Sequence, residues 1–251
     1  MATRQTLAVV VNVADHGESD KIVTLFTAAH GKLTGIAKGA KRSKKRFVNK
    51  LEIFTLLEVQ YATNTRSSLI RIDQASLVSA FPLLRKDYGR YAAASLICEL
   101  ILHWTRENDA ETELFTLLAW SLEGLGKGQP AARTVVLFGV RMLDILGYQP
   151  QLSGCLDCGK LDAAGSPYRF STGRSGMLCA RCVRNNSTPA QIPLSLNTIK
   201  LLQKAQELEK NKLGRLQFSE TSTSEAVTLL RYYSRHLLQR DLQSWNFLPK
   251  V

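Results

Sequence analysis

The sequence of 251 residues has no long hydrophobic run and no export signal. A membrane span needs roughly 18–20 consecutive apolar residues, and no stretch approaches that length. Residues 1–15 also lack the order of basic, apolar and small residues that marks a signal peptide. We therefore expect a cytoplasmic protein with no membrane association, whose cysteine thiols stay reduced.

Signatures of the common enzyme classes are missing as well. The sequence contains no G-x-x-x-x-G-K-[ST] phosphate loop, no G-x-G-x-x-G after a strand, no H-E-x-x-H and no G-x-S-x-G. The four histidines are scattered, and none has a carboxylate or cysteine at ligand spacing. Asp15, Glu18 and Asp20 are one candidate group for a nuclease metal ion, although acids in a turn usually face solvent. We expect no catalytic residue and a protein that is not an enzyme.

Acidic residues are scarce relative to basic ones. The chain has 21 Asp and Glu against 33 Lys and Arg, which gives a net charge of +12. The excess lies in residues 1–80 (+6), 151–185 (+3) and 186–251 (+4), whereas residues 81–150 carry −1. Such an uneven distribution suits a polyanionic partner that faces one side of the molecule. The alternative is a general basic background that only keeps the protein soluble.

The first 80 residues consist of short apolar and β-branched runs separated by turns, which is typical of strands. No helix in this region is long enough to connect parallel strands, so we expect an antiparallel meander or a small barrel. The predicted strands are residues 5–14, 21–28, 33–38, 51–61 and 68–77.

Beyond residue 81 the hydrophobic spacing becomes helical. Capping boxes at Asn108–Glu111 and Ser222–Glu225 predict two helix starts, and further helices are expected over 88–105, 131–146 and 195–210. Residues 148–192 are rich in glycine and turns and contain four of the five cysteines. We expect the α+β class with a barrel domain at 1–80, a helical domain at 81–147 and 193–251, and a module at 148–192 inserted into the helical domain.

The four cysteines form two C-x-x-C pairs separated by 20 residues, Cys155/Cys158 and Cys179/Cys182. Two residues between cysteines allow both thiolates to point at one ion, and two such pairs complete a tetrahedron around zinc. Four thiolates leave no open position for water, so the expected role of the zinc is structural. A disulfide framework, a redox pair and an iron–sulfur cluster fit the spacing and compartment less well. The fifth cysteine, Cys98, is expected to be a buried packing residue.

A strongly basic segment, KGAKRSKKRFVNK, connects the third and fourth predicted strands at residues 38–50. It contains no acid, so its positive charges would repel one another unless a phosphate backbone neutralised them. An aromatic side chain within it could stack on a base or instead anchor the next strand in the core. The candidate nucleic-acid-binding residues are Lys38, Lys41, Arg42, Lys44, Lys45, Arg46, Phe47 and Lys50. A solvated loop is the alternative, and composition does not separate DNA from RNA.

Four short stretches of the chain, together with the order of barrel, helices and inserted cysteine pairs, resemble the bacterial RecO family over nearly the full length. They are GESDK at 17–21, LFT at 25–27, GKL at 31–33 and AKGAKR at 37–42, where Lys41 replaces an arginine that is common in the family. The resemblance implies an N-terminal OB-fold and binding of single- and double-stranded DNA. It also implies annealing of complementary strands and, together with RecR, help in loading RecA onto DNA coated by single-strand-binding protein.

The resemblance further implies partners and a location. It implies nucleoid-associated action in a bacterial cytoplasm, RecF as a further candidate partner, and docking of the acidic, apolar C-terminal tail of single-strand-binding protein on the helical part. Arg133 or Arg141 beside the apolar stripe at 135–146 is the candidate site for that tail. A protein of another class, an RNA- or ribosome-associated basic zinc protein, has the same charge pattern and stays open as an alternative.

Overall fold

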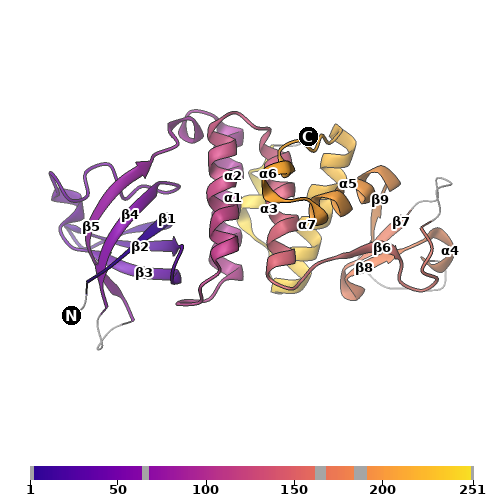
Figure 1. The fold of residues 1–251 in the computed structure, drawn as a ribbon, viewed down its shortest axis with the longest axis horizontal. Coiled ribbons are helices and arrows are strands. Elements are labelled where there is room, and N and C mark those ends of the chain that lie inside the picture. Colours follow the sequence, from indigo (N-terminus) through magenta and orange to yellow (C-terminus); the bar gives the residue numbers. More distant parts are fainter. Residues whose placement is uncertain (1–2, 64–67, 162–167, 184–190, 250–251) are drawn as a thin grey trace. The chain divides into compact units, whose positions relative to one another are not determined.

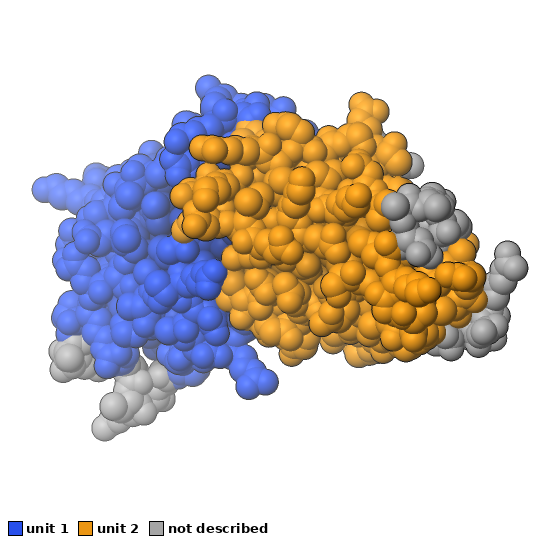
Figure 2. All heavy atoms as spheres, turned by 45° about the vertical axis from the view of Figure 1, so that its right-hand side comes forward, with its two compact units in different colours: residues 1–128 blue, residues 129–251 orange. Residues whose placement is uncertain are grey.

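The computed structural model describes residues 3–63, 68–161, 168–183 and 191–249. The chain divides into two compact units, residues 1–128 and 129–251, which are coloured separately in Figure 2. The first two helices therefore belong to the same unit as the strands that precede them, and the three-part boundaries expected from the sequence stay a prediction. Figure 1 labels the elements of both units.

Unit 1 begins with a closed barrel of five strands in the order β1-β2-β3-β5-β4. Strand β1 is long enough to pair with both β2 and β4, and a short parallel pairing of β3 with β5 closes the barrel. Side chains that alternate along the strands are buried in one core, which is the physical origin of the apolar pattern in the sequence. The strands are Thr3–His16, Asp20–Thr27, Gly31–Ala37, Leu56–Ala62 and Ile70–Ser79.

Two details of the barrel differ from the sequence prediction. The fourth strand was expected from residue 51 but begins at Leu56, because Phe54 adopts φ +73° and its ring is fully buried. The parallel closure depends on Gly35, where an added Cβ would lie 2.6 Å from Cγ1 of Ile70. A small barrel is confirmed, and glycine at this position lets β5 approach β3 closely.

Helices α1 (Tyr88–Trp104) and α2 (Thr112–Gly126) complete unit 1, after a 3-10 turn at Pro82–Arg85. The Asp87 side chain accepts a hydrogen bond from the Arg90 amide and caps α1. The capping box expected at Asn108 is wrong: α2 follows Glu111 without a side-chain cap, and the Asn108 amide donates instead to the Lys32 carbonyl.

Unit 2 contains the other helices, α3 to α7, and a small sheet. The last helix begins one turn earlier than expected, because Ser219 rather than Ser222 caps it. Glu225, expected in the capping box, instead accepts hydrogen bonds from Ser195 and Thr198 at the start of α5. The helices are α3 Ala131–Ile145, α4 Ala180–Val183, α5 Leu196–Glu207, α6 Lys210–Leu213 and α7 Glu220–Leu238.

The four-stranded sheet of unit 2 has the order β6-β8-β7-β9 and contains the first cysteine at the end of β6. The Phe170 ring meets the Tyr233 ring of α7 edge-on, with centroids 5.1 Å apart, so the sheet packs on the helices. The strands are β6 Gln151–Cys155, β7 Tyr168–Ser171, β8 Gly176–Leu178 and β9 Gln191–Leu194. The α+β class, with a barrel followed by helices that flank the cysteine segment, is confirmed. Among the described helices, none is both long enough and apolar enough to cross a membrane.

Candidate nucleic-acid interface and metal centre

The basic loop, residues 38–50, is anchored to the barrel at two points. The Phe47 ring is only 3% exposed and belongs to the barrel core. The Lys50 ammonium donates to the carbonyls of Lys45, Arg46 and Ala75, at 3.1, 3.2 and 2.8 Å. Because several carbonyls satisfy this ammonium, Lys50 shapes the loop and has little capacity left for a phosphate.

The cations of the loop fall into two groups. Lys38, Lys44 and Lys45 are exposed, and the last two make no hydrogen bond or ion pair through their side chains with any described residue. Lys41 instead lies 3.0 Å from the Asp15 carboxylate and also donates to the Gly17 carbonyl. The ammonium groups most available to an external polyanion are therefore those of Lys44 and Lys45.

The two arginines of the loop each make a contact within unit 1 and are also exposed to solvent. Arg42 lies 3.6 Å from the Glu18 carboxylate, but its side chain is 73% exposed and the pair is accessible to competing ions. Arg46 donates to the Lys38 carbonyl, and its guanidinium lies over the Phe47 ring, 5.0 Å from the centroid. Both guanidinium groups keep exposed surface that a phosphate could approach.

The burial of Phe47 bears on one predicted role. A ring that is 3% exposed in the barrel core cannot stack on a base in this conformation. The structure therefore favours the alternative stated from the sequence, that Phe47 anchors the start of the next strand. Nucleic-acid binding by the other candidate residues stays a prediction.

The acidic residues near the first turn form part of the scaffold of the loop. Asp20 accepts hydrogen bonds from the Gly39 amide and from the Ser19 hydroxyl, and these bonds lower the pKa of its carboxyl group. Asp15 and Glu18 pair with loop cations. Within the described ranges, the one group of potential metal ligands that converges is the cysteine group, so Asp15, Glu18 and Asp20 do not form a nuclease-like metal site.

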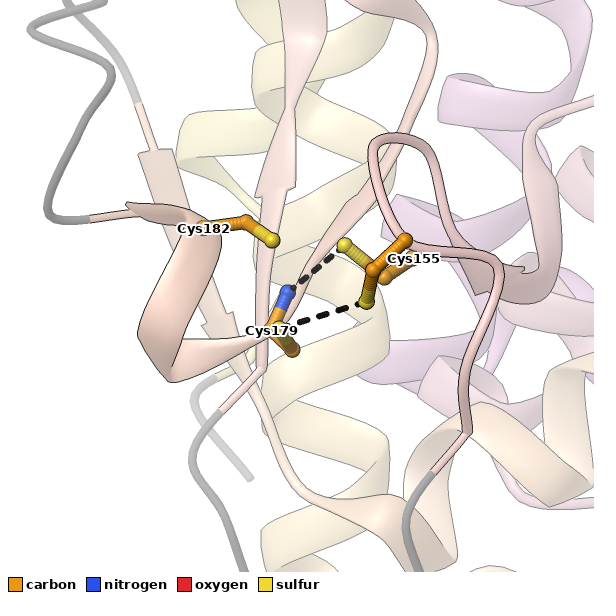
Figure 3. Close-up of side chains that lie close together, drawn as sticks. Cys155, Cys179 and Cys182 are labelled. Carbon is orange, nitrogen blue, oxygen red and sulfur yellow. Dashed lines mark hydrogen bonds between the residues drawn. The ribbon is translucent and has the colours of Figure 1, made fainter.

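The four cysteines of unit 2 converge on one point, as Figure 3 shows for three of them. All four sulfur atoms lie within 4.8 Å of one another, and those of Cys158 and Cys179 are 3.8 Å apart. Tetrahedral zinc with Zn–S bonds of about 2.3 Å requires sulfur separations of about 3.8 Å, whereas a disulfide requires about 2.05 Å. None of the five cysteines forms a disulfide, and the spacing fits a metal site.

Backbone amides help to prepare this site for negative charge. Burial raises the pKa of Cys155, but amides of Cys158, Cys179 and Asp157 directed at its sulfur outweigh burial and lower it to about 6. Arg174 pairs with Asp157 at 2.7 Å and adds a positive charge beside the cluster. The four sulfurs could hold a metal ion. Cys98 is buried within α1, where burial raises its pKa, as expected for a packing residue.

Both arginines predicted to bind an acidic tail make contacts within unit 2. Arg133 is 8% exposed and donates to the Gln217 side chain at 3.0 Å, while Arg141 pairs with Asp144 and donates to the Gln206 carbonyl. The apolar stripe of α3 is buried in the core of unit 2. Arg133 nevertheless lines a hollow of about 300 Å³.

Comparison with known proteins decides the family. The family model described as "Recombination protein O N terminal" matches residues 1–81, and "Recombination protein O C terminal" matches residues 85–246. The chain belongs to the RecO family. It is 33% identical to "DNA repair protein RecO" of Syntrophus aciditrophicus over 250 residues, covering 100% of this chain and 96% of the relative.

Other RecO proteins match at similar levels. The chain is 35% identical to "DNA repair protein RecO" of Anaeromyxobacter sp. (strain K), over 97% of this chain and 94% of the relative. It is 35% identical to the protein of the same name from Geobacter metallireducens, over 100% and 99%. Membership of the RecO family supports a role in DNA repair and recombination.

The stretches that resemble RecO contain residues whose structural role the sequence did not reveal. Lys32 of the GKL stretch donates to the carbonyls of Leu102 and Thr105 at the end of α1, at 2.8 and 2.6 Å. At Gly31, with φ +64°, an added Cβ would lie 1.7 Å from the Asp109 carbonyl oxygen. These contacts join β3 to residues 70 to 78 positions later in the chain, and no local sequence pattern could have indicated them.

Proposed function

We propose that this RecO protein binds single- and double-stranded DNA through the basic loop and anneals complementary strands. The observation that carries the proposal is the pair Lys44 and Lys45, exposed and without ion pairs in the described structure, on a loop anchored by Phe47 and Lys50. Anchoring orders the backbone of the loop in advance, so binding a phosphate costs less ordering of the backbone than binding by an unstructured tail.

The physical barrier to annealing is the repulsion between two phosphate backbones. Cations that neutralise phosphates release condensed counterions and lower that repulsion, so strands of like charge can meet. Neither step requires bond making or breaking, and we propose that the protein acts without being an enzyme.

Zinc is the ion we propose for the cysteine site. Four thiolates at tetrahedral spacing favour zinc, and they leave no position for a catalytic water, so its role would be structural. The metal would tie the turn after β6 to the short helix α4. Because the small sheet also packs on α7 through Phe170, we expect the metal to add stability rather than to supply the only core of the module.

The partners follow from membership of the family and remain part of the proposal. RecR would act with this chain in assisting RecA loading on DNA coated by single-strand-binding protein, and RecF is a further candidate. The acidic, apolar tail of single-strand-binding protein would dock on the helices of unit 2, where the hollow beside Arg133 is open and the stripe of α3 is buried. The expected location is the bacterial cytoplasm, at the nucleoid.

The direct test replaces Lys44 and Lys45 with glutamine and measures binding of a labelled single-stranded oligonucleotide across a salt series. Loss of two phosphate contacts should reduce the magnitude of the salt slope by about 1.4, since each contact on a single strand contributes about 0.7. The matched control replaces Lys200 and Lys204, two exposed lysines of α5, and changes the net charge equally.

An unchanged affinity and salt slope in the Lys44→Gln/Lys45→Gln protein would show that the basic loop does not bind the strand. Competition between DNA and RNA of the same sequence tests the alternative class. A strong preference for RNA would favour an RNA-associated protein over a DNA annealing protein.

A further inference from the structure

One face of α7 in unit 2 borders two cavities. The residues of α7 that line them are spaced as i, i+3, i+4, i+7 and i+8, so they lie along one side of the helix. The cavities measure about 580 and 560 Å³, and both are lined by Tyr232. The two cavities adjoin at Tyr232 and are together called the α7 groove here. Its lining on this helix is Ser224, Val227, Thr228, Arg231, Tyr232, Arg235 and His236, followed by the C-cap residue Gln239.

The lining of the α7 groove is basic. It contains the guanidinium groups of Arg231, Arg235 and Arg240 against a single carboxylate, Asp241. Asp241 lies 3.9 Å from Arg231, which also donates to Asn246. Arg235 is exposed and forms no hydrogen bond or ion pair with any residue that the structure describes. The groove therefore keeps an uncompensated positive charge.

Tyr232 gives the groove an aromatic surface. Its side chain is 46% exposed although it lies between two cavities on a helix whose opposite face is buried. An exposed aromatic ring beside cations is the combination that binds single-stranded nucleic acid, because bases stack on the ring while phosphates contact the charges.

We propose that the α7 groove is a second nucleic-acid-binding surface, which takes a short stretch of single strand with a base stacked on Tyr232 and phosphates near Arg235 and Arg240. The inference deepens the proposed function and rests on it. Each unit would then hold its own segment of strand, the basic loop in unit 1 and the α7 groove in unit 2. An annealing protein needs such a division, because two strands must be held at once.

A single strand suits the groove better than an acidic peptide. Arg231 and Arg235 are one helical turn apart, about 6 Å along the axis, so the cations recur along the groove. A repeated charge matches a polymer with one phosphate per nucleotide, and Tyr232 adds a stacking surface for a base, which an acidic peptide lacks. The large exposed aromatic surface also has a partner in every base, independent of sequence.

The experiment uses the full chain and two variants with different signatures. Tyr232→Ala should weaken binding of a labelled oligothymidylate about fivefold, the low end of the effect of losing one stacked base, and leave the salt slope unchanged. Arg235→Gln should reduce the magnitude of the salt slope by about 0.7. Both are measured also in the Lys44→Gln/Lys45→Gln background, where the α7 groove should account for a larger share of the remaining affinity.

Arg215→Gln is the matched control, because Arg215 is an exposed arginine of unit 2 that lines none of these cavities. Unfolding temperatures of all variants should equal that of the wild type, since Tyr232 and Arg235 are exposed. As a measurement that needs no variant, photocrosslinking of a bromodeoxyuridine-substituted strand should label the peptide that contains Tyr232.

Variants that bind the strand like Arg215→Gln, together with no crosslink in α7, would overturn the inference. If Lys44→Gln/Lys45→Gln still loses affinity in that case, the proposed function stands and only the second surface fails. Unchanged strand binding with weakened binding of a poly-aspartate peptide would assign the groove to an acidic protein segment and would equally overturn it.

Discussion

Lys32→Met tests the contact that fixes β3 to the end of α1. Methionine keeps most of the length of the apolar stem but removes an ammonium that donates to two carbonyls at 2.8 and 2.6 Å. A hydrogen bond from a charged group contributes about 1.5–3 kcal/mol, and the carbonyls at the end of a helix have no partner within the helix. In the variant, water can replace part of these hydrogen bonds to the two carbonyls. We therefore expect the free energy of unfolding of unit 1 to fall by about 2–4 kcal/mol.

The assay is thermal and urea unfolding, followed by hydrogen exchange read by mass spectrometry. The unfolding temperature of unit 1 should fall by on the order of 10 °C. Amides in the last turn of α1 should exchange faster, whereas those of α7 should be unchanged. Lys86→Met, a change at an exposed lysine of the same unit, is the matched control. Equal unfolding of the two variants would refute the reasoning.

The same lysine gives a dependence on pH. Burial lowers the pKa of Lys32 below its ordinary value of 10.5, although Glu107 opposes the shift. The unfolded chain therefore binds this proton more tightly than the folded chain, so the stability of the wild type should rise with pH between the lowered pKa and 10.5. Lys32→Met should lack this rise, and an identical pH profile for both proteins would contradict the assignment.

Three further changes have expected outcomes. Gly31→Ala should prevent stable folding of unit 1, because the added Cβ would clash with a backbone carbonyl. Gly17→Ala, at a residue with φ +56° and open space around it, should lower the free energy of unfolding by only about 1 kcal/mol. Thermal melting followed by circular dichroism distinguishes the two variants. Glu225→Gln should lower the stability of unit 2 by about 2 kcal/mol because its carboxylate accepts three hydrogen bonds, whereas the exposed Glu220→Gln should have little effect in urea titration. Cys158→Ser should reduce bound zinc from about one ion per chain to almost none by elemental analysis, and full retention of zinc would contradict the four-cysteine site.

Local sequence patterns predicted the strands, the helices and the cysteine cluster, because these features depend mainly on residues close together in the sequence. Runs of β-branched residues marked the strands, helical spacing marked the helices, and the C-x-x-C spacing placed four sulfurs together before any coordinates. In each case the signal is contained within a few residues or in a spacing that chemistry restricts.

Features that depend on distant contacts were not predictable. The partner of Lys32 lies about 70 residues away, and the Glu225 carboxylate binds the start of another helix rather than its own. The strand expected from residue 51 failed because Phe54 takes a left-handed conformation to reach the core. The charge of the basic loop was clear from the sequence, but which cations are free of acids depended on the fold of the first turn.

The α7 groove shows the same limit for a functional surface. The sequence places Arg231 and Arg235 away from the apolar side of the helix, which describes any solvated face. Only the cavities on either side of Tyr232 distinguish this face from others. Their walls include Asp241, Trp245, Asn246, Leu248 and Pro249, which follow the helix, so the groove exists only in the folded chain.

Strand annealing across a salt series measures most directly whether outward cations of the basic loop bring two phosphate backbones together. Complementary labelled oligonucleotides are mixed with the wild-type protein, with Lys44→Gln/Lys45→Gln, or with Lys200→Gln/Lys204→Gln. The account predicts acceleration by the wild type that declines as salt rises, a matching result for the α5 control, and a weaker acceleration by the loop variant at every salt concentration. Equal acceleration by the loop variant and the wild type would contradict it.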